Sequence, residues 1–346
     1  MAYSTIDKSS SFMDTKLYTG TGSSNAITGV GFQPDFTWIK KRTTANSILT
    51  DAVRGATKYL ISNEADIEAT AAETLKSFDA DGFTVGTSGD VNANAGTYVG
   101  WNWKAGGAGS SNTDGSTTAT VSVNATSKFS IVKYVGTGSS ATVGHGLGVA
   151  PDWILMKNMT DSNNWWWISH KSLDAPEKSL HLNVTNAVGT NSSGITARST
   201  NTFTVVTDSG TNKSGSNYIA YCFANVPGYS KFGDYIGNGS TTYADCPFVY
   251  TGFKPSVVII KNKTTAANWE MFDNKRIVAG YNAEIHPSAS AGESVPPGDR
   301  RILFVSNGFK IETSTTGAMN TTGDKYVYMA WGQPIVGTNN TPATAT

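Results

Sequence analysis

The stretch YVGTGSS at residues 134–140 decides how the whole sequence is interpreted, because YTGTGSS at 18–24 and YIGNGST at 235–241 repeat it. A phosphate-binding loop would need either a third glycine that opens a helix or a lysine beside its last glycine. Neither feature follows Gly138, where the chain continues SATVGHGLGVAPDW. We therefore interpret Gly-x-Gly as a turn that needs a positive φ or a close approach of two backbones.

Three further landmarks recur in the same order in each copy. They are a proline followed six residues later by a lysine (PDFTWIK from Pro34, PDWILMK from Pro151, PSVVIIK from Pro255), a phenylalanine (Phe83, Phe203, Phe309) and an aromatic segment (98–103, 218–223, 326–331). Corresponding landmarks lie 101 to 120 residues apart, which suits a small sandwich domain better than a solenoid turn. The sequence therefore predicts three copies of one unit.

The predicted fold is all-β, with three tandem β-sandwich repeat domains of jelly-roll type. The Pro-to-Lys segments are short apolar runs rich in β-branched and aromatic residues, which is typical of strands buried on both faces. Residues 104–120 are rich in Gly, Ser and Thr, which indicates a flexible connection. We expect five segments: repeat 1 at 1–104, a linker at 105–127, repeat 2 at 128–228, repeat 3 at 229–336 and a C-terminal tail at 337–346.

Composition excludes several classes of partner. Charged residues make up 15% of the chain and the formal net charge is zero, so we expect no binding to nucleic acid. The N-terminus lacks the pattern of a signal peptide and no apolar run reaches 18 residues, so we expect neither secretion by that route nor membrane insertion. Only two cysteines occur, at 222 and 246, which excludes a disulfide scaffold.

No motif nominates a catalytic residue, a metal site or a cofactor, and we expect a protein that is not an enzyme. The four histidines do not have the spacing of convergent metal ligands; they are His145, His170, His181 and His286. An Asp-x-x-Arg pair recurs at Asp51–Arg54 and Asp273–Arg276, and the second copy has His170 instead. A carboxylate and a guanidinium at this spacing most simply form an ion pair that ties a turn to the sheet.

Tryptophans supply the candidate ligand-binding residues. SNNWWWISHK at 162–171 contains Trp165, Trp166 and Trp167, and AANWEMFDNK at 266–275 contains Trp269. On a strand, Trp165 and Trp167 would share one face and Trp166 would take the other. Such faces suit stacking on sugar rings or a protein interface, whereas burial in a core is the alternative.

The quoted landmarks, together with LTDAVRG, SFDADGFTVG, GTYVGWNWKAGG and KFGDYIGNGS, resemble repeat domains in virion proteins of tailed bacteriophages, especially marine ones. The resemblance runs from Tyr18 to Trp331 and implies a structural protein of the tail or of a surface appendage. We expect it to attach the virion to a host receptor, either a glycan or a protein. The alternatives are a capsid decoration or tail-assembly subunit that contacts only virion proteins and, third, a polysaccharide-degrading enzyme.

The same resemblance implies where the protein works and with what. It would assemble in the host cytoplasm, reside in the virion, contact other virion proteins and form a homo-oligomer, with a trimer favoured by analogy.

Overall fold

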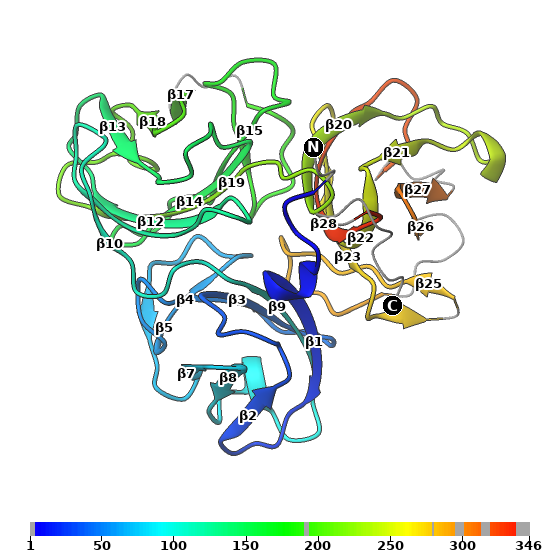
Figure 1. The fold of residues 1–346 in the computed structure, drawn as a ribbon, viewed down its shortest axis with the longest axis horizontal. Helices are drawn as coiled ribbons and strands as arrows, with labels where there is room; N and C mark the ends of the chain where they lie inside the picture. The colour runs from blue at the N-terminus through cyan, green and yellow to red at the C-terminus, as the bar shows by residue number, and fades with distance from the viewer. Residues whose placement is uncertain (1–3, 190–193, 279, 295–300, 313–318, 337–346) are drawn as a thin grey trace.

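The computed structural model describes residues 4–189, 194–278, 280–294, 301–312 and 319–336, so the expected tail at 337–346 lies outside the described residues. Within these ranges the protein is nearly all β, and its strands pair antiparallel in several sheets (Figure 1). The helical turns found there are η1 (Ser9–Ser11), α1 (Gly89–Asn92) and η2 (Tyr243–Asp245). None of the helices in the described part of the chain has the length and apolarity needed to cross a membrane.

Repeat 1 forms a six-stranded sheet in the order β1-β9-β3-β4-β5-β6 and a three-stranded sheet in the order β2-β8-β7. Its strands are β1 (Met13–Thr19), β2 (Asn25–Thr28), β3 (Phe36–Lys41), β4 (Ser47–Asp51), β5 (Lys58–Ile61), β6 (Ala69–Thr70), β7 (Leu75–Asp79), β8 (Gly82–Val85) and β9 (Thr97–Trp103).

Repeat 2 forms a seven-stranded sheet in the order β10-β11-β12-β19-β14-β15-β16 and a three-stranded sheet in the order β13-β18-β17. Its strands are β10 (Ser110–Asn112), β11 (Ala119–Asn124), β12 (Phe129–Val135), β13 (Ala141–Gly144), β14 (Trp153–Asn158), β15 (Trp167–His170), β16 (Leu180–His181), β17 (Ile195–Arg198), β18 (Thr202–Val205) and β19 (Asn217–Phe223).

Repeat 3 forms a four-stranded sheet in the order β20-β28-β22-β23, a three-stranded sheet in the order β21-β27-β26 and the small pair β24-β25. Its strands are β20 (Ser230–Ile236), β21 (Phe248–Tyr250), β22 (Phe253–Asn262), β23 (Trp269–Asp273), β24 (Ile277–Val278), β25 (Tyr281–Asn282), β26 (Arg301–Val305), β27 (Gly308–Glu312) and β28 (Lys325–Pro334).

The same strand order recurs in the three large sheets, as β1-β9-β3-β4, β12-β19-β14-β15 and β20-β28-β22-β23. Figure 1 shows these large sheets facing one another around the centre of the molecule, with the small sheets on the outside. Each large sheet is therefore buried on both faces, as the apolar Pro-to-Lys segments predict.

The alternation of side chains along β14 shows how both faces are buried. Trp153 and Leu155 belong to a central core that all three repeats share, whereas Ile154 and Met156 belong to the separate core of repeat 2. Because side chains on a strand alternate between its faces, every second residue of β14 enters the central core. The repeats therefore pack on one another through a common hydrophobic centre.

Three aromatic residues on the final strands of the repeats meet in this centre. The ring centres of Trp103 and Phe223 are 6.2 Å apart, and each lies 5.4 Å from that of Trp331. These residues occupy corresponding positions of β9, β19 and β28, so the repeats surround a pseudo-threefold axis.

The Gly-x-Gly turns confirm both reasons given for glycine. The first glycine of each copy allows a close approach, since a Cβ on Gly20 would lie 2.2 Å from the carbonyl oxygen of Ala93. The second has a positive φ, which is 70° at Gly22. An asparagine that the sequence analysis did not single out holds each turn, as where Asn92 Oδ1 accepts a hydrogen bond of 2.9 Å from Thr21 N. The sequence does contain a pattern that identifies this asparagine. Each copy has it six residues before the first tyrosine of the final strand, at Asn92, Asn212 and Asn320.

The segment 105–127, which was predicted to be a flexible linker, is structured. It contains β10 and β11, and β11 pairs with β12 from Ala119↔Tyr134 to Asn124↔Phe129. Ala119 and Val121 also enter the core of repeat 2. The segment is structured because its few apolar residues alternate with Thr and Ser, which suits a strand at the edge of a sheet. Cys222 and Cys246 are both buried, and no disulfide joins them.

Candidate binding surface

The structure separates the four candidate tryptophans. Trp165 is 40% exposed, whereas Trp166, Trp167 and Trp269 are buried. Trp166 and Trp269 belong to the central core, and Trp167 belongs to the core of repeat 2. Trp166 and Trp167 enter different cores, although Trp166 precedes β15, which begins at Trp167. The alternative of core packing therefore holds for three of the four, and their proposed role in ligand binding is corrected.

The indole N–H groups of the two central tryptophans join different repeats. Trp166 Nε1 in repeat 2 donates to Ile61 O in repeat 1 at 2.8 Å, and Trp269 Nε1 in repeat 3 donates to His181 O in repeat 2 at 2.9 Å. Because each donor is buried, its carbonyl partner satisfies a group that would be costly to leave unpaired. These tryptophans fix the repeats relative to one another.

The lysine of each Pro-to-Lys landmark has a similar role. The three residues are Lys40, Lys157 and Lys261, and their side chains are buried. Lys157 Nζ donates to Asn164 O in its own repeat and to Ala65 O in repeat 1. Lys40 and Lys261 likewise bind one carbonyl of their own repeat and one of a neighbouring repeat. Burial lowers the pKa of all three ammonium groups to about 8.

Two junctions between repeats contain the predicted Asp–Arg ion pairs. Arg54 Nε donates to Asp51 Oδ2, and Arg54 N donates to Asp51 Oδ1 at 2.9 Å, which ties the turn after β4 as predicted. Tyr221 of repeat 2 then donates to Asp51 Oδ2 at 2.7 Å. Both charged side chains are fully buried.

Asp273 and Arg276 repeat this arrangement between repeats 3 and 1. Arg276 Nε donates to Asp273 Oδ2 at 2.7 Å, and Trp101 Nε1 of repeat 1 donates to the same oxygen at 3.1 Å. Each carboxylate therefore accepts hydrogen bonds from its own turn and from the next repeat.

At the third junction, between repeats 2 and 3, His170 stands in place of the buried Asp–Arg pair, and a separate ion pair of 3.1 Å joins Lys263 of repeat 3 to Asp174 of repeat 2. His170 Nε2 lies 3.2 Å from Tyr328 O of repeat 3, and His170 Nδ1 accepts a hydrogen bond of 3.1 Å from Ser172 N. Burial lowers the pKa of His170 to about 3, so the imidazole is neutral near pH 7. An imidazole that accepts through Nδ1 and donates through Nε2 satisfies both contacts.

A buried Glu–His–Glu cluster lies beside β23 in repeat 3. His286 Nδ1 is 3.1 Å from Glu270 Oε2, and His286 Nε2 is 2.9 Å from Glu284 Oε1. The two carboxylates raise the pKa of His286 to about 10, despite its burial. These three residues lie close enough together to hold a metal ion, but a protonated imidazole already bridges the carboxylates. We infer that the cluster stabilises repeat 3.

The exposed aromatic residues of repeat 3 form the best candidate for binding. Phe248 and Tyr250 are 49% and 54% exposed and share one face of β21, because the buried Val249 lies between them. Lys231 donates to Tyr250 O at 2.7 Å, and its Nζ lies 5.0 Å from the centre of the Tyr250 ring. We call Phe248, Tyr250 and Lys231 the aromatic surface.

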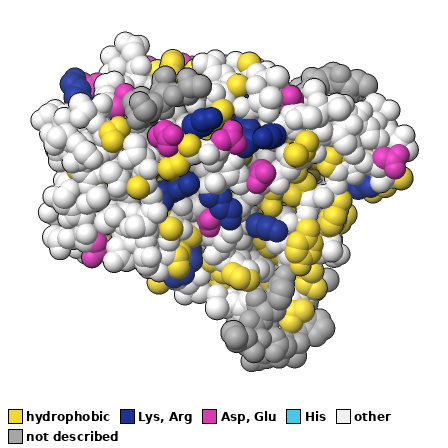
Figure 2. Space-filling model, turned by 90° about the horizontal axis from the view of Figure 1, so that it is seen from above, with side chains coloured by type: hydrophobic (Ala, Val, Ile, Leu, Met, Phe, Trp, Pro, Cys, Tyr) yellow, Lys and Arg dark blue, Asp and Glu magenta, His cyan; other side chains and the backbone are white. Residues whose placement is uncertain are grey.

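The aromatic surface lines a groove of about 370 Å³ beside β20, which also contains Lys171 and Asp234. Figure 2 shows hydrophobic side chains gathered on the side of the molecule where repeat 3 lies in Figure 1. Exposed aromatic rings next to charged and hydroxyl groups can stack on sugar rings or anchor a protein partner. Phe248 and Tyr250 were not among the predicted binding residues, although the alternation of the FVY segment at 248–250 indicates a strand with both aromatic side chains on one face.

A family model described as "Domain of unknown function (DUF7483)" matches residues 8–334, a range that contains all three repeats. The chain therefore belongs to this family. No curated protein matches the sequence.

Proposed function

We propose that the protein is a structural component of a bacteriophage virion, in the tail or in a surface appendage, and that it attaches the particle to a host receptor. The resemblance of the repeat landmarks to phage virion proteins supports the virion role. In this proposal each repeat is a β-sandwich of jelly-roll type, and the chain acts by binding and not by catalysis.

The observation that carries the adhesive role is the exposure of Phe248 and Tyr250 on one face of β21. Large aromatic side chains dominate the energy of many binding surfaces, because each one removes a large apolar area from water while few bonds lose rotational freedom. Buried contacts between the repeats make the sheets beneath these side chains rigid, so little of the protein must become ordered on binding. Several copies on one particle would multiply weak contacts.

The second candidate is a capsid decoration or tail-assembly subunit that contacts only other virion proteins. Aromatic side chains at an open groove are equally typical of such an interface. An enzyme that degrades polysaccharide is the third candidate.

The test uses the purified full-length chain on an array of bacterial surface polysaccharides. We expect the wild type to bind at least one of them, and the double substitution Phe248→Ala/Tyr250→Ala to bind at least tenfold more weakly with an unchanged melting temperature. Tyr243→Ala is the matched control, because Tyr243 is a similarly exposed aromatic residue of repeat 3 that does not line this groove.

Each result separates the candidates. Binding that is unaffected by the double substitution would show that the aromatic surface is not the adhesive one. Absence of glycan binding, together with labelling of the phage particle by an antibody against the chain, would support the assembly subunit. Release of reducing ends from a polysaccharide would support the enzyme.

A further inference from the structure

The three repeats present three corresponding sheet edges, of which one is covered. The edge strands are β1, β12 and β20, which occupy the same place in the recurring strand order. β12 is covered by β11, whereas β1 and β20 are the terminal strands of their sheets in the described part of the chain. An uncovered strand presents N–H and C=O groups that can pair with an added strand.

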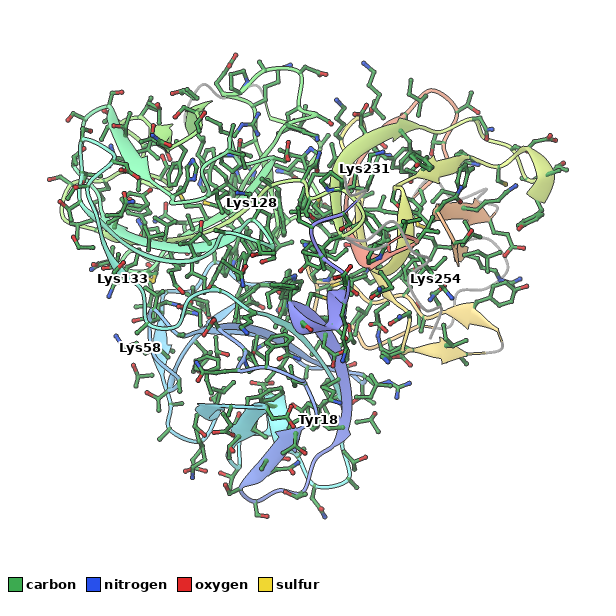
Figure 3. All side chains as sticks on the ribbon, viewed as in Figure 1. Tyr18, Lys58, Lys128, Lys133, Lys231 and Lys254 are labelled. Atoms are coloured by element: carbon green, nitrogen blue, oxygen red, sulfur yellow. The ribbon has the colours of Figure 1, made fainter. Side chains whose placement is uncertain are left out.

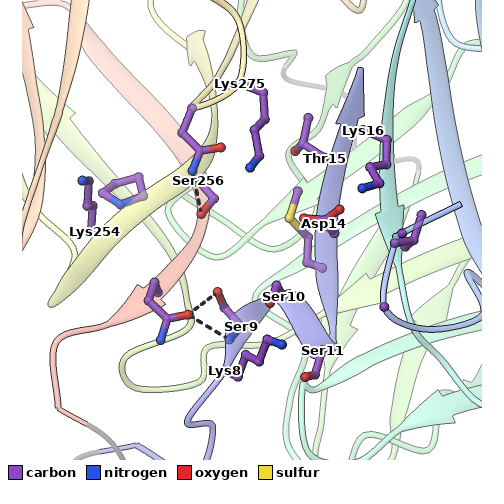
Figure 4. Close-up of a pocket in the computed structure, with 17 residues that line it drawn as sticks. Lys8, Ser9, Ser10, Ser11, Asp14, Thr15, Lys16, Lys254, Ser256 and Lys275 are labelled. Carbon is purple, nitrogen blue, oxygen red and sulfur yellow. Dashed lines mark hydrogen bonds between the residues drawn. The ribbon is translucent and has the colours of Figure 1, made fainter. Parts of the chain in front are cut away.

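The place that β11 fills in repeat 2 is a groove in repeat 1. Gly146 lies against Val121 and Val123 of β11, and the corresponding Gly29 of repeat 1 lines an open groove beside β1. This groove has a volume of about 650 Å³ and lies between β1 and the end of repeat 3 where β22 begins (Figure 4). We call it the β1 groove.

The β1 groove has a strong excess of positive charge. Four of its lining residues are lysines, namely Lys8, Lys16, Lys254 and Lys275, and Asp14 is the one acidic residue among those that line it. Figure 4 shows these lysines distributed around the opening, on both the β1 side and the repeat 3 side. A ligand with negative charge on both of its faces would therefore find partners on both walls.

An unpaired polar atom points to the same groove. Thr15 lies on β1, lines the groove and is 4% exposed, and no group in the described part of the chain forms a hydrogen bond with its Oγ1. The corresponding residues of the other two repeats are apolar, Ile131 on β12 and Phe232 on β20. Buried hydroxyl groups normally form a hydrogen bond. A ligand in the groove could supply the missing partner of the Thr15 hydroxyl.

We infer that the β1 groove binds an extended acidic segment of a partner protein, which pairs antiparallel with β1 as β11 pairs with β12. In this register the side chain at the place of Val121 faces Lys16, because Val121 faces Val132 in repeat 2. The side chain at the place of Ser122 faces Thr15, because Ser122 faces Ile131. Acidic residues at these two places would pair with Lys16 and accept the hydrogen bond of Thr15.

Charge argues against a second copy of this chain as the occupant. The other open edge, β20, is lined by Lys171 and Lys231 against Asp234, so it is also positive. Two positive edges repel each other when they approach. The inferred binding does not depend on the adhesive role of the aromatic surface, because the two grooves lie beside different strands.

The test uses synthetic peptides built on residues 118–125, whose sequence is TATVSVNA. The probe TATDEVNA has acidic residues at the places of Val121 and Ser122, and TATKKVNA is the charge-reversed control. We expect the full-length protein to bind the probe at least tenfold more tightly than the control in fluorescence polarisation. We also expect bound probe to slow hydrogen exchange of the β1 amides, because they gain partners.

Variants of the protein locate the site. Lys16→Glu/Lys275→Glu should weaken probe binding at least tenfold, and Lys254→Glu, at an exposed position, should weaken it severalfold without affecting folding. The matched control is Lys133→Glu on β12, which Figure 3 places on the opposite side of the molecule from Lys254. It should leave binding within twofold of the wild type.

Four results would overturn the inference. The first is equal binding of the acidic and lysine peptides. The second is undiminished binding of a probe methylated on alternate backbone nitrogens, because strand pairing needs those N–H groups. The third is polygalacturonate binding that is as tight as that of the probe and equally sensitive to Lys16→Glu/Lys275→Glu, which would identify a general anion site. The fourth is self-association that this double substitution abolishes, which would make a second copy the occupant.

Discussion

Two junctions between repeats contain a buried Asp–Arg pair, whereas the third has a neutral histidine at the corresponding place. Asp51 and Arg54 meet Tyr221 where repeats 1 and 2 join, and the junction of repeats 3 and 1 is built in the same way. At the junction of repeats 2 and 3 the three corresponding residues are His170, Leu173 and Met329.

The difference shows that the three corresponding residues of a junction change together from one repeat to another. Each buried aspartate accepts from its arginine and from a donor of the next repeat, and an arginine that lost this aspartate would keep only a longer ion pair, from Arg54 to Glu68 or from Arg276 to Glu293. Met329 offers no donor, and His170, which stands at the place of the aspartate, is neutral and lies 3.2 Å from the backbone carbonyl oxygen of Tyr328. The apolar Leu173 then packs in the central core.

The largest effect is expected from breaking one charged junction. Asp273→Ala removes the shorter of the two ion pairs of the buried Arg276, leaving the 3.3 Å contact with Glu293, and deprives Trp101 Nε1 of its acceptor, so we expect a loss of about 3–5 kcal/mol in the free energy of unfolding. Urea unfolding followed by tryptophan fluorescence measures this loss. Asp245→Ala, at an exposed aspartate, serves as the control. A loss below about 1 kcal/mol would mean that the ion pair contributes little to the junction.

Acid should weaken the junction of repeats 2 and 3 through His170. Its pKa is about 3 in the folded protein and about 6.5 in the unfolded chain, so its contribution is complete above pH 6.5 and declines as the pH falls toward 3. Between pH 6.5 and 5 the wild type should lose about 2 kcal/mol more than His170→Gln, because glutamine does not titrate. Urea unfolding of both proteins at the two pH values gives the difference. Equal losses in the two proteins would contradict the assignment.

A smaller effect is expected when a charged set is exchanged as a whole for the neutral one. Asp51→His, Arg54→Leu and Tyr221→Met together should cost about 1.5 kcal/mol, well below the cost of Asp51→Ala alone, because no buried charge is left unpaired. Unfolding measurements on the single, double and triple variants give the coupling between the three sites. Additive losses would show that the residues do not act as a set.

The smallest effect separates two adjacent tryptophans at the junction of repeats 1 and 2. Trp165→Ala should change the free energy of unfolding by less than about 0.5 kcal/mol, because its side chain is partly exposed and its ring contacts His181 of the same repeat. Trp166→Ala should cost about 3–5 kcal/mol, since it leaves a large cavity in the central core. Thermal and urea unfolding of both variants test this contrast. A similar loss of stability for the two variants would show that Trp165 also contributes to the packing between repeats.

Local features were predictable from the sequence where a residue acts on its own turn or strand. The Gly-x-Gly turns, the Asp51–Arg54 and Asp273–Arg276 pairs and the apolar Pro-to-Lys strands belong to this class. The prediction of a flexible linker at 105–127 was wrong, because composition alone does not reveal that β11 can pair with the edge strand β12.

The sequence by itself determined an all-β chain with three copies of one set of landmarks, because glycine turns, strand periodicity and short-range ion pairs depend on residues close together in the chain. Only the tertiary structure decided what the second face of each large sheet packs against. Lys157 and Trp166 reach carbonyls of repeat 1, and such contacts follow from the arrangement of the repeats around a shared core. An apolar strand requires burial on both faces, but hydrophobic burial is non-directional, so the strand does not specify which partner buries it.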